Sequence, residues 1–324
     1  MSARTRLYRN GVLELEDFPV ADVSDHLRDP SSVVWVDVCE PGASDIAMIA
    51  EELQLHRLAV EDAVTEHQRP KLDRYDTHLF VTGYAVHLDP VSGRLTQAEV
   101  DTFVTRQALV TVRKSEDFPI ADVVERWDAS PDLAKHGTSF LLYGLLDVIV
   151  DGHFLAVQSL DDEIEGLEDM LFDELPKSRE VLRRSFELRK SLVLLRRVVV
   201  PMREVVNSLM RRDLRVVDPA MEPYYQDVYD HVLRVTEWTE SLRDLVNTIL
   251  ETHMTMQGNR MNSIMKKVTS WAAIIAVPTA ITGYYGQNVP YPGFGQPMGF
   301  WVSTISIIVI SGTLYLVFRA NDWL

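Results

Sequence analysis

Blocks of apolar and polar residues predict a mixture of strands and helices over the first 137 residues. Three runs rich in β-branched and aromatic residues, each bounded by turn formers, are typical of strands: Val33–Val38, His78–Val86 and Thr102–Val112. Three segments with apolar residues at helical spacing predict helices: Ser44–Gln54, His56–His67 and Asp117–Trp127. This mixture predicts an α/β domain over residues 1–137.

After residue 137 the apolar spacing becomes helical for most of the remaining length. Thr138 to Asp173 contains no proline and predicts one helix of about 36 residues, roughly 54 Å long. A second helix is expected from Ser178 to Arg212, interrupted only by Pro201. A third is expected from Tyr224 to Tyr285, and its 62 residues would reach about 93 Å.

The end of the chain has the pattern of a membrane domain. From Val268 to Phe318 there is no Asp, Glu, Lys, Arg or His. This run contains two apolar segments of 18 and 19 residues, each near the roughly 20 residues that a membrane-spanning helix needs. Between them, four glycines and three prolines predict a turn at the far surface. The predicted parts are an α/β domain (1–137), a helical hairpin (138–223), a stalk helix (224–267), and a transmembrane domain with a short tail (268–324), in which spans 268–285 and 300–318 flank a loop at 286–299.

Charge sets the expected orientation. The basic residues Lys266, Lys267 and Arg319 flank the apolar run and the loop has none, so the positive-inside rule places both termini in the cytoplasm of a multi-pass cell-membrane protein. The whole chain carries 48 acidic and 32 basic residues, a formal net charge of -16, which favours a large soluble part. Its polar start lacks a signal-peptide core, and the single Cys39 excludes a disulfide framework.

One face of the third helix is distinctive when residues are taken at alternating steps of three and four, because its members within the apolar segment are all small or hydroxyl-bearing. This stripe consists of Asn262, Met265, Thr269, Ala272, Ala276, Thr279 and Gly283. Small residues at such spacing favour close packing between membrane helices. The same stripe could instead line a water-filled pore, which would require several copies around an axis because two helices cannot enclose one. Both explanations stay open from the residues alone.

The order of segments resembles a known family. A helix ending in "YGQN", a short polar loop, a second span and a C-terminal "WL" are similar to the CorA family of divalent metal ion (magnesium/cobalt) transporters, whose motif here is Gly-Met-Asn. The stretches "LAVEDAVTEHQRPKLDRYDTHLFV" and "YYQDVYDHVLRVTEWTESLRDLVNTILE" resemble the family's segment before its central strand and its stalk helix. The resemblance implies a homopentamer with a cytoplasmic α/β funnel, a pore-lining stalk helix and an outer second span, embedded in the lipid bilayer.

The resemblance also implies a selectivity filter formed by Gly286, Gln287 and Asn288, with Asn288 as a ring at the external mouth. Mg²⁺ releases water reluctantly, and a neutral amide oxygen can hold its hydration shell without trapping the ion. Gln287 replaces the motif's methionine and the loop has no acid. The resemblance makes Mg²⁺ the expected ion, and these two departures from the family's pattern leave Co²⁺, Ni²⁺ and Zn²⁺ open.

Four acids match the family's regulatory site for cytoplasmic Mg²⁺ between subunits. Asp62 and Asp227 match its ligands, and Glu61 and Asp147 match accessory acids. Opposed carboxylates repel each other when empty and are bridged when Mg²⁺ lies between them. From charge alone, the same residues would be solvated acids on helix surfaces. Glu251 matches a further position that we expect beside the pore, on the face of Asn262.

The resemblance implies a divalent cation channel that admits Mg²⁺ across the plasma membrane and is gated by cytoplasmic Mg²⁺, with Mg²⁺ as both transported and regulatory ion. The expected partners are other copies of the chain, the bilayer and divalent cations, with no nucleic acid and no organic cofactor. An enzyme is not expected, because the chain has no HExxH, Walker A or GxSxG motif. A non-conducting membrane scaffold or sensor remains the alternative.

Overall fold

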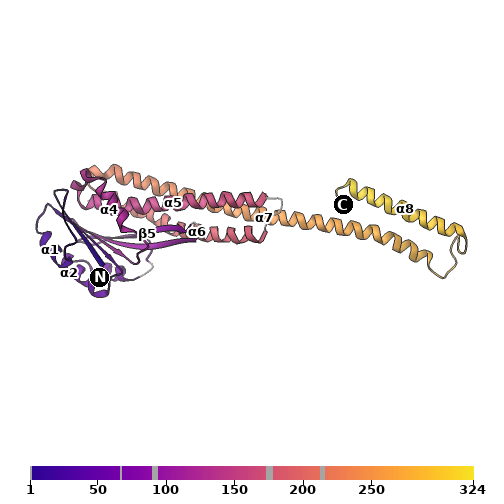
Figure 1. The fold of residues 1–324 in the computed structure, drawn as a ribbon, viewed down its shortest axis with the longest axis horizontal. Helices are drawn as coiled ribbons and strands as arrows, with labels where there is room; N and C mark the ends of the chain where they lie inside the picture. Colours follow the sequence, from indigo (N-terminus) through magenta and orange to yellow (C-terminus); the bar gives the residue numbers. More distant parts are fainter. Residues whose placement is uncertain (1, 66–67, 90–93, 173–177, 212–215) are drawn as a thin grey trace. The chain divides into compact units, whose positions relative to one another are not determined.

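The structure is a computed structural model that describes residues 2–65, 68–89, 94–172, 178–211 and 216–324. The chain divides into two compact units, residues 1–249 and 250–324 (Figure 1). The first unit contains a mixed sheet with helices on both faces. The second contains the later part of one long helix, a loop and a final helix.

Seven strands form the sheet of the first unit, in the order β2-β1-β3-β7-β6-β5-β4. Their bounds are β1 (Ser2–Arg9), β2 (Val12–Glu16), β3 (Ser32–Cys39), β4 (Lys71–Arg74), β5 (Leu79–Asp89), β6 (Arg94–Val104) and β7 (Ala108–Arg113). Strands β3 and β7 pair in parallel, and the other neighbours pair antiparallel. The predicted strands at Val33–Val38 and His78–Val86 correspond to β3 and β5, whereas β1, β2 and β4 were not predicted.

Two tight turns explain why some strands were not predicted from the sequence. Asn10 and Gly11 both have positive φ, 49° and 79°, which is the geometry of the two-residue hairpin turn between β1 and β2. The single strand expected over Thr102–Val112 is wrong, because the chain reverses at Thr105–Gln107 and forms β6 and β7. The N–H of Thr105 donates a 2.8 Å hydrogen bond to the carbonyl oxygen of Ala108, and the N–H of Ala108 donates a 2.8 Å hydrogen bond to the Thr105 hydroxyl, which closes this turn.

Alternation along the strands divides the core between the two faces of the sheet. On one face, Val34, Val36 and Val38 of β3 pack with the first helices. These are η1 (Val20–Asp22), α1 (Val23–His26), α2 (Ala43–Leu53) and α3 (Arg57–Val64). On the other face, Trp35 joins the core formed with the later helices. These are α4 (Ile120–Asp128), η2 (Pro131–His136), α5 (Thr138–Phe172), α6 (Ser178–Leu209), η3 (Pro219–Met221) and the start of α7 (Glu222–Tyr285).

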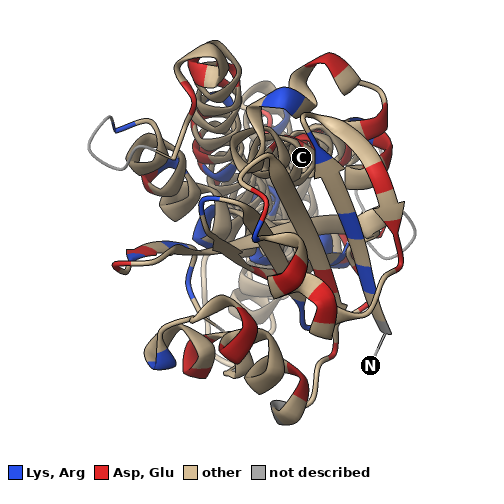
Figure 2. Ribbon diagram, turned by 90° about the vertical axis from the view of Figure 1, so that its left-hand side faces the viewer, with Lys and Arg blue, Asp and Glu red and all other residues tan. Residues whose placement is uncertain are grey.

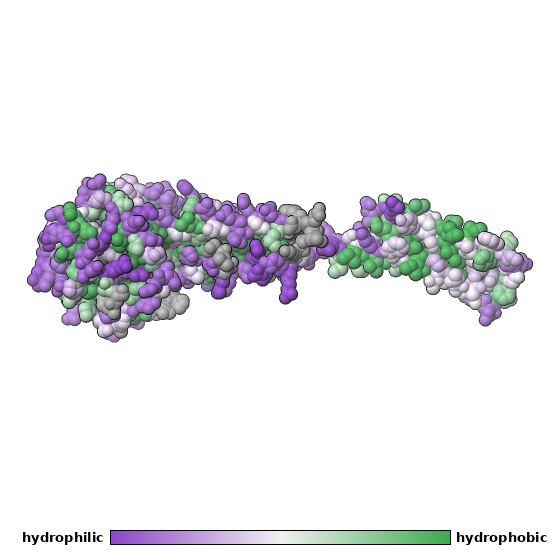
Figure 3. Space-filling view, in the orientation of Figure 1, coloured by the Kyte–Doolittle hydropathy of each residue, from purple (hydrophilic) through white to green (hydrophobic). Residues whose placement is uncertain are grey.

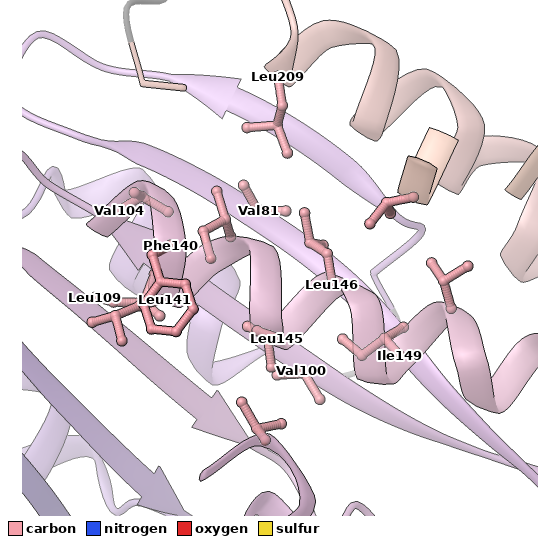
Figure 4. Packing of buried hydrophobic residues seen from close by; sticks show 14 of the residues in the cluster. Val81, Val100, Val104, Leu109, Phe140, Leu141, Leu145, Leu146, Ile149 and Leu209 are labelled. Carbon is pink, nitrogen blue, oxygen red and sulfur yellow. The ribbon is translucent and has the colours of Figure 1, made fainter. Parts of the chain in front are cut away.

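Helix α5 forms the centre of the larger core. Figure 4 shows its residues Phe140, Leu145 and Ile149 lying over the strand residues Val81 and Val100, and all five side chains are buried. Figure 1 shows that α5, α6 and the first part of α7 run side by side in this unit. The predicted helices from Thr138 and Ser178 begin as expected, and their predicted last residues lie outside the described residues.

Within the described ranges, three helices are long and apolar enough to cross a membrane by length and composition. In α5, 67% of the most apolar 18 residues are buried inside the structure, so its apolar character is explained by the core. The corresponding shares are 6% in the helix ending at Tyr285 and 0% in α8 (Pro297–Ala320). Figure 3 shows the hydrophobic residues that these two helices leave at the surface of the second unit.

Candidate metal-ion path and regulatory acids

The loop that follows α7 leaves two amide side chains free of the helix. Helix α7 ends at Tyr285, and its last turn is closed by a 2.8 Å hydrogen bond from the N–H of Gly286 to the carbonyl oxygen of Thr282. Gln287 and Asn288 come next, and both are exposed. The structure therefore places the predicted filter residues just beyond the end of the helix that carries the stripe.

Aromatic and glycine residues give this loop a defined conformation. The ring of Tyr291 lies 5.1 Å from that of Tyr285 and 5.2 Å from that of Phe294, and the Tyr291 hydroxyl donates a 2.9 Å hydrogen bond to the carbonyl oxygen of Tyr285. Gly293 has φ of 86°, a conformation that favours glycine. A Cβ added at Gly299 would lie 2.7 Å from the carbonyl oxygen of Gly293, so the backbones approach too closely for a side chain. This packing explains the uncharged "PYPGFG" sequence.

The stripe on α7 is exposed along its whole length in this chain. Every member, from Asn262 to Gly283, is an exposed residue. Glu251 is also exposed and lies eleven residues, about three turns, before Asn262, which places it on the same side of the helix. The residues expected beside a pore thus share one open face of α7.

Helix α8 covers a different face of α7. Ser270 is fully buried, and Ile274, Val277 and Ile281 are half-buried at steps of three and four. At 100° per residue this face lies about 150° around the helix from the stripe. Residues of α8 at matching steps are also half-buried: Thr304, Ile307, Ser311, Leu314 and Phe318. Packing between α7 and α8 therefore does not account for the small residues of the stripe.

The end of the chain returns to α7 near Asn262. The Lys266 ammonium group lies 5.9 Å from the centre of the Trp323 ring, within the range of a cation–π interaction. Trp323 in turn stacks on Phe318, with 5.6 Å between ring centres and 6° between planes. These contacts fix the short tail beside the part of the stripe that precedes the apolar segment.

Asp62 lies on α3 and already has a cationic neighbour in this chain. The Lys71 ammonium group lies 2.5 Å from one Asp62 carboxylate oxygen and 3.0 Å from a carboxylate oxygen of Asp73. Burial would lower the pKa of Lys71, but the hydrogen bonds to Asp62 and Asp73 outweigh it and raise that pKa. Lys71 is therefore a protonated counter-ion for the predicted ligand, a role that was not predicted from the sequence.

Asp147 lies on α5 and is buried, with 4% of its surface exposed. The Arg126 guanidinium group of α4 forms ion pairs with Asp147 and, at 2.5 Å, with Asp151. Burial raises the pKa of Asp147, Arg126 opposes the rise, and the nearby carboxylates of Asp151 and Asp227 add to it. Asp227, from a distant part of the sequence, is thus near enough for its charge to act on the pKa of Asp147. Arg126, which joins Asp147 and Asp151, was not predicted from the sequence.

Glu61 and Asp227 are both exposed, on α3 and α7 respectively. Figure 2 shows Asp and Glu residues on the helices and strands of this unit, with Lys and Arg among them. In the part of the chain that the structure describes, no group of three or more His, Cys, Asp or Glu side chains is placed to hold a metal ion. Exposed carboxylates fit a hydrated Mg²⁺, which is commonly bound through one or two such groups and retained water.

The end of α3 is held to the sheet by a partly buried lysine of the segment that follows β7. Lys114 donates a hydrogen bond to the carbonyl oxygen of Ala63 in the last turn of α3, and its ammonium group lies 3.3 Å from Asp101. Asp101 is fully buried and accepts a 2.7 Å hydrogen bond from Thr82. Burial raises the pKa of Asp101 to about 6, although Thr82 and Lys114 lower it. Helix α3, which carries Glu61 and Asp62, is thus fixed at its C-terminal end.

Comparison with known proteins identifies the family. The chain is 29% identical over 316 residues to the cobalt/magnesium transport protein CorA of Thermotoga maritima, covering 96% of this chain and 90% of that protein. It is 33% identical over 288 residues to YfjQ of Bacillus subtilis, 88% of each chain. Its fold is similar to the complete structure of the CorA magnesium transporter from Methanocaldococcus jannaschii, with a TM-score of 0.81 at 22% identity over 100% of this chain and 99% of that one.

The sequence model of the family described as "CorA-like Mg2+ transporter protein" matches residues 30–319. This match confirms the resemblance seen in the sequence, and the fold comparison confirms an α/β N-terminal part followed by long helices. Because the match covers most of both compact units, this protein belongs to the CorA-like Mg²⁺ transporter family.

Proposed function

We propose that this protein is a divalent cation channel that admits Mg²⁺ across the cell membrane and closes when cytoplasmic Mg²⁺ binds between subunits. In this proposal α7 and α8 are the two spans and both termini lie in the cytoplasm. Five copies surround the pore, with the stripe of α7 facing the axis. Gly286, Gln287 and Asn288 serve as a variant of the family's Gly-Met-Asn filter.

One observation carries the proposal: the stripe is exposed on the side of α7 opposite the face that α8 covers. An exposed face of threonine, alanine and glycine is a poor match for lipid beside the apolar faces of the same helix. It suits either a water-filled axis or contact with another copy. Because the stripe leads to Asn288 at the end of the helix, the axis explains both features together.

The proposed selectivity follows from amide chemistry. A ring of Asn288 side chains would present neutral oxygens to a hydrated cation and would orient its water shell. Carboxylates at this position would hold Mg²⁺ more strongly and release it more slowly. The driving force is large, because 100 mV acts on a doubly charged ion with about 4.6 kcal/mol, twice the single-charge value. Such a gradient requires a means of closing the pore.

The proposed closure uses the acids of the first unit. Asp62 and Glu61 on α3 of one subunit, together with Asp227 on α7 of its neighbour, would hold a hydrated Mg²⁺ and draw the subunits together. Asp147 would be an accessory acid: its carboxylate contacts Arg126 and adds negative potential beside Asp227. Because α7 carries both Asp227 and the stripe, a change at the acids acts on the helix that lines the pore.

Ion uptake by the purified protein in liposomes tests the function. Mg²⁺, Co²⁺, Ni²⁺ and Zn²⁺ should be compared under one imposed voltage, and we expect Mg²⁺ to enter. The Asn288→Ala variant should lose uptake by at least tenfold while keeping its assembly by size-exclusion chromatography. Gln296→Ala is a matched control, because it removes another exposed amide of the same loop.

Normal uptake by a well-assembled Asn288→Ala variant would contradict the filter assignment. An equal loss in Gln296→Ala would show that the loop tolerates no amide loss and that Asn288 has no special role. Absence of flux for every ion in the unmodified protein would instead favour a non-conducting membrane scaffold or sensor.

A further inference from the structure

Lys71 occupies a position between two carboxylates that the proposed Mg²⁺ site does not explain. Its ammonium group bridges Asp62 on α3 and Asp73 on β4, at 2.5 and 3.0 Å. It also lies 5.6 Å from the centre of the Phe80 ring on β5. All three charged side chains are partly shielded, with 21% of Lys71, 28% of Asp62 and 41% of Asp73 exposed.

Strand geometry fixes which of the two carboxylates is the permanent neighbour. Lys71 pairs with Thr82 and Asp73 with Phe80 in the register of β4 and β5. Residues two apart on a strand point to the same face, so Lys71 and Asp73 stay side by side whatever α3 does. Asp62 lies on α3, so its contact with Lys71 can be broken, and another cation can take the place of Lys71, without any change in β4.

We propose that Lys71 is a built-in competitor for the cation at Asp62, and that Asp73 keeps the ammonium group when Mg²⁺ takes Asp62. This inference rests on the proposed function, in which Asp62 is a ligand of the regulatory Mg²⁺. Without bound Mg²⁺, Lys71 neutralises Asp62, so the empty site is less repulsive than bare carboxylates would be. The concentration of Mg²⁺ that closes the channel is then set by this competition.

Charge explains why such a competitor suits a magnesium sensor. The attraction between a cation and Asp62 scales with the charge of the cation at a given distance. Na⁺ and K⁺ carry the same single charge as the ammonium group, which is already tethered beside Asp62, and therefore gain little by replacing it. Mg²⁺ carries twice that charge and can displace it. Lys71 would thus make the site insensitive to monovalent ions.

The test is the Mg²⁺ concentration that half-protects the purified full-length protein in detergent against limited proteolysis. Lys71→Met should lower this concentration about fivefold, which corresponds to about 1 kcal/mol. Asp73→Asn should raise it, because Lys71 then has Asp62 as its main partner. The two variants change the local charge by one unit each and are predicted to act in opposite directions.

Arg69→Met is the matched control. Arg69 is exposed and lies two residues before Lys71, so its removal changes the nearby charge without breaking the contact with Asp62. A shift equal to that of Lys71→Met would overturn the inference, because general electrostatics would then suffice. An unchanged half-protecting concentration in both Lys71→Met and Asp73→Asn would overturn it as well.

Asp62→Asn separates this inference from the proposed function. If Asp62→Asn weakens Mg²⁺ protection and Lys71→Met has no effect, the regulatory site stands and the competitor role fails. If Asp62→Asn itself has no effect, Asp62 is not a Mg²⁺ ligand and both fail. If the inference is correct, Lys71→Met should produce no shift in the Asp62→Asn background, since the carboxylate for which the two cations compete is gone.

Discussion

Arg126→Met is expected to expose the energetic cost of the buried acid on α5. The Arg126 guanidinium group is the ion-pair partner of Asp147 and Asp151. Methionine keeps much of the length and the apolar stem of the side chain but removes the charge. Asp151 is half-exposed and can be solvated, whereas Asp147 is buried and would be left without its cation.

The size of the effect follows from burial. Removing one partner of a fully buried ion pair costs about 3–5 kcal/mol, because the other charge is left uncompensated. Here the Arg126 side chain is 39% exposed, so solvent already screens part of the interaction and about 2 kcal/mol is a better expectation. For a domain of this size, 1 kcal/mol shifts the midpoint of thermal unfolding by about 2–4 °C, which predicts a loss of about 4–8 °C.

The loss should depend on pH. The pKa of Asp147 is raised in the folded protein by burial, and Arg126 opposes that rise. A carboxyl group with a raised folded pKa stabilises the fold at pH values below its unfolded pKa, near 4, and this contribution disappears as the pH rises through the folded value. Removing Arg126 raises the folded pKa further, so the variant should approach the unmodified protein at low pH and fall behind it toward neutral pH.

Thermal unfolding followed by tryptophan fluorescence, in detergent at pH 5 and pH 8, measures the effect. Adding Asp147→Asn to Arg126→Met should restore most of the stability at pH 8, because no buried charge then remains. Arg196→Met is the control, since Arg196 and Glu240 form an ion pair in which both side chains are about half-exposed. An equal loss in Arg196→Met, or no recovery with Asp147→Asn, would refute the assignment of Arg126 as the partner of a buried carboxylate.

Two further predictions address the stripe and the tether of α3. In a Cys39→Ser background, the Thr279→Cys variant should react with small charged thiol reagents at low Mg²⁺, and this modification should block uptake. The Ile281→Cys variant should react much less, because this position packs against α8. Equal reaction at both positions would reject the pore-facing assignment. Because burial raises the pKa of Asp101 to about 6, its contribution to stability is present below about pH 4 and lost as the pH rises through about 6. Asp101→Asn should therefore show a smaller drop in unfolding temperature between pH 5 and pH 8, and an unchanged drop would contradict this.

The helical parts of the chain were predictable because their signals are local. The stripe depends only on residues three and four apart on one helix, so its members necessarily share a face once α7 forms. The turn between α7 and α8 follows from glycine and proline in the same way. The strands were harder to predict. Asn10-Gly11 is a typical hairpin sequence, but the strands on either side of it were not predicted. The turn at Thr105–Gln107 contains no glycine or proline to mark it.

The sequence by itself determined two long apolar helices, the shared helix face of the stripe from Asn262 to Gly283, and the loop in which Asn288 lies. Only the tertiary structure decided that α5 buries its apolar residues in a core, and that Asp62 and Asp147 each form an ion pair with a basic side chain. Arg126 and Asp147 come from two helices that each bury their own apolar stripe, and Lys71 comes from a strand. No local pattern records which charged residues such elements bring together, because side-chain pairing between elements depends on how they pack.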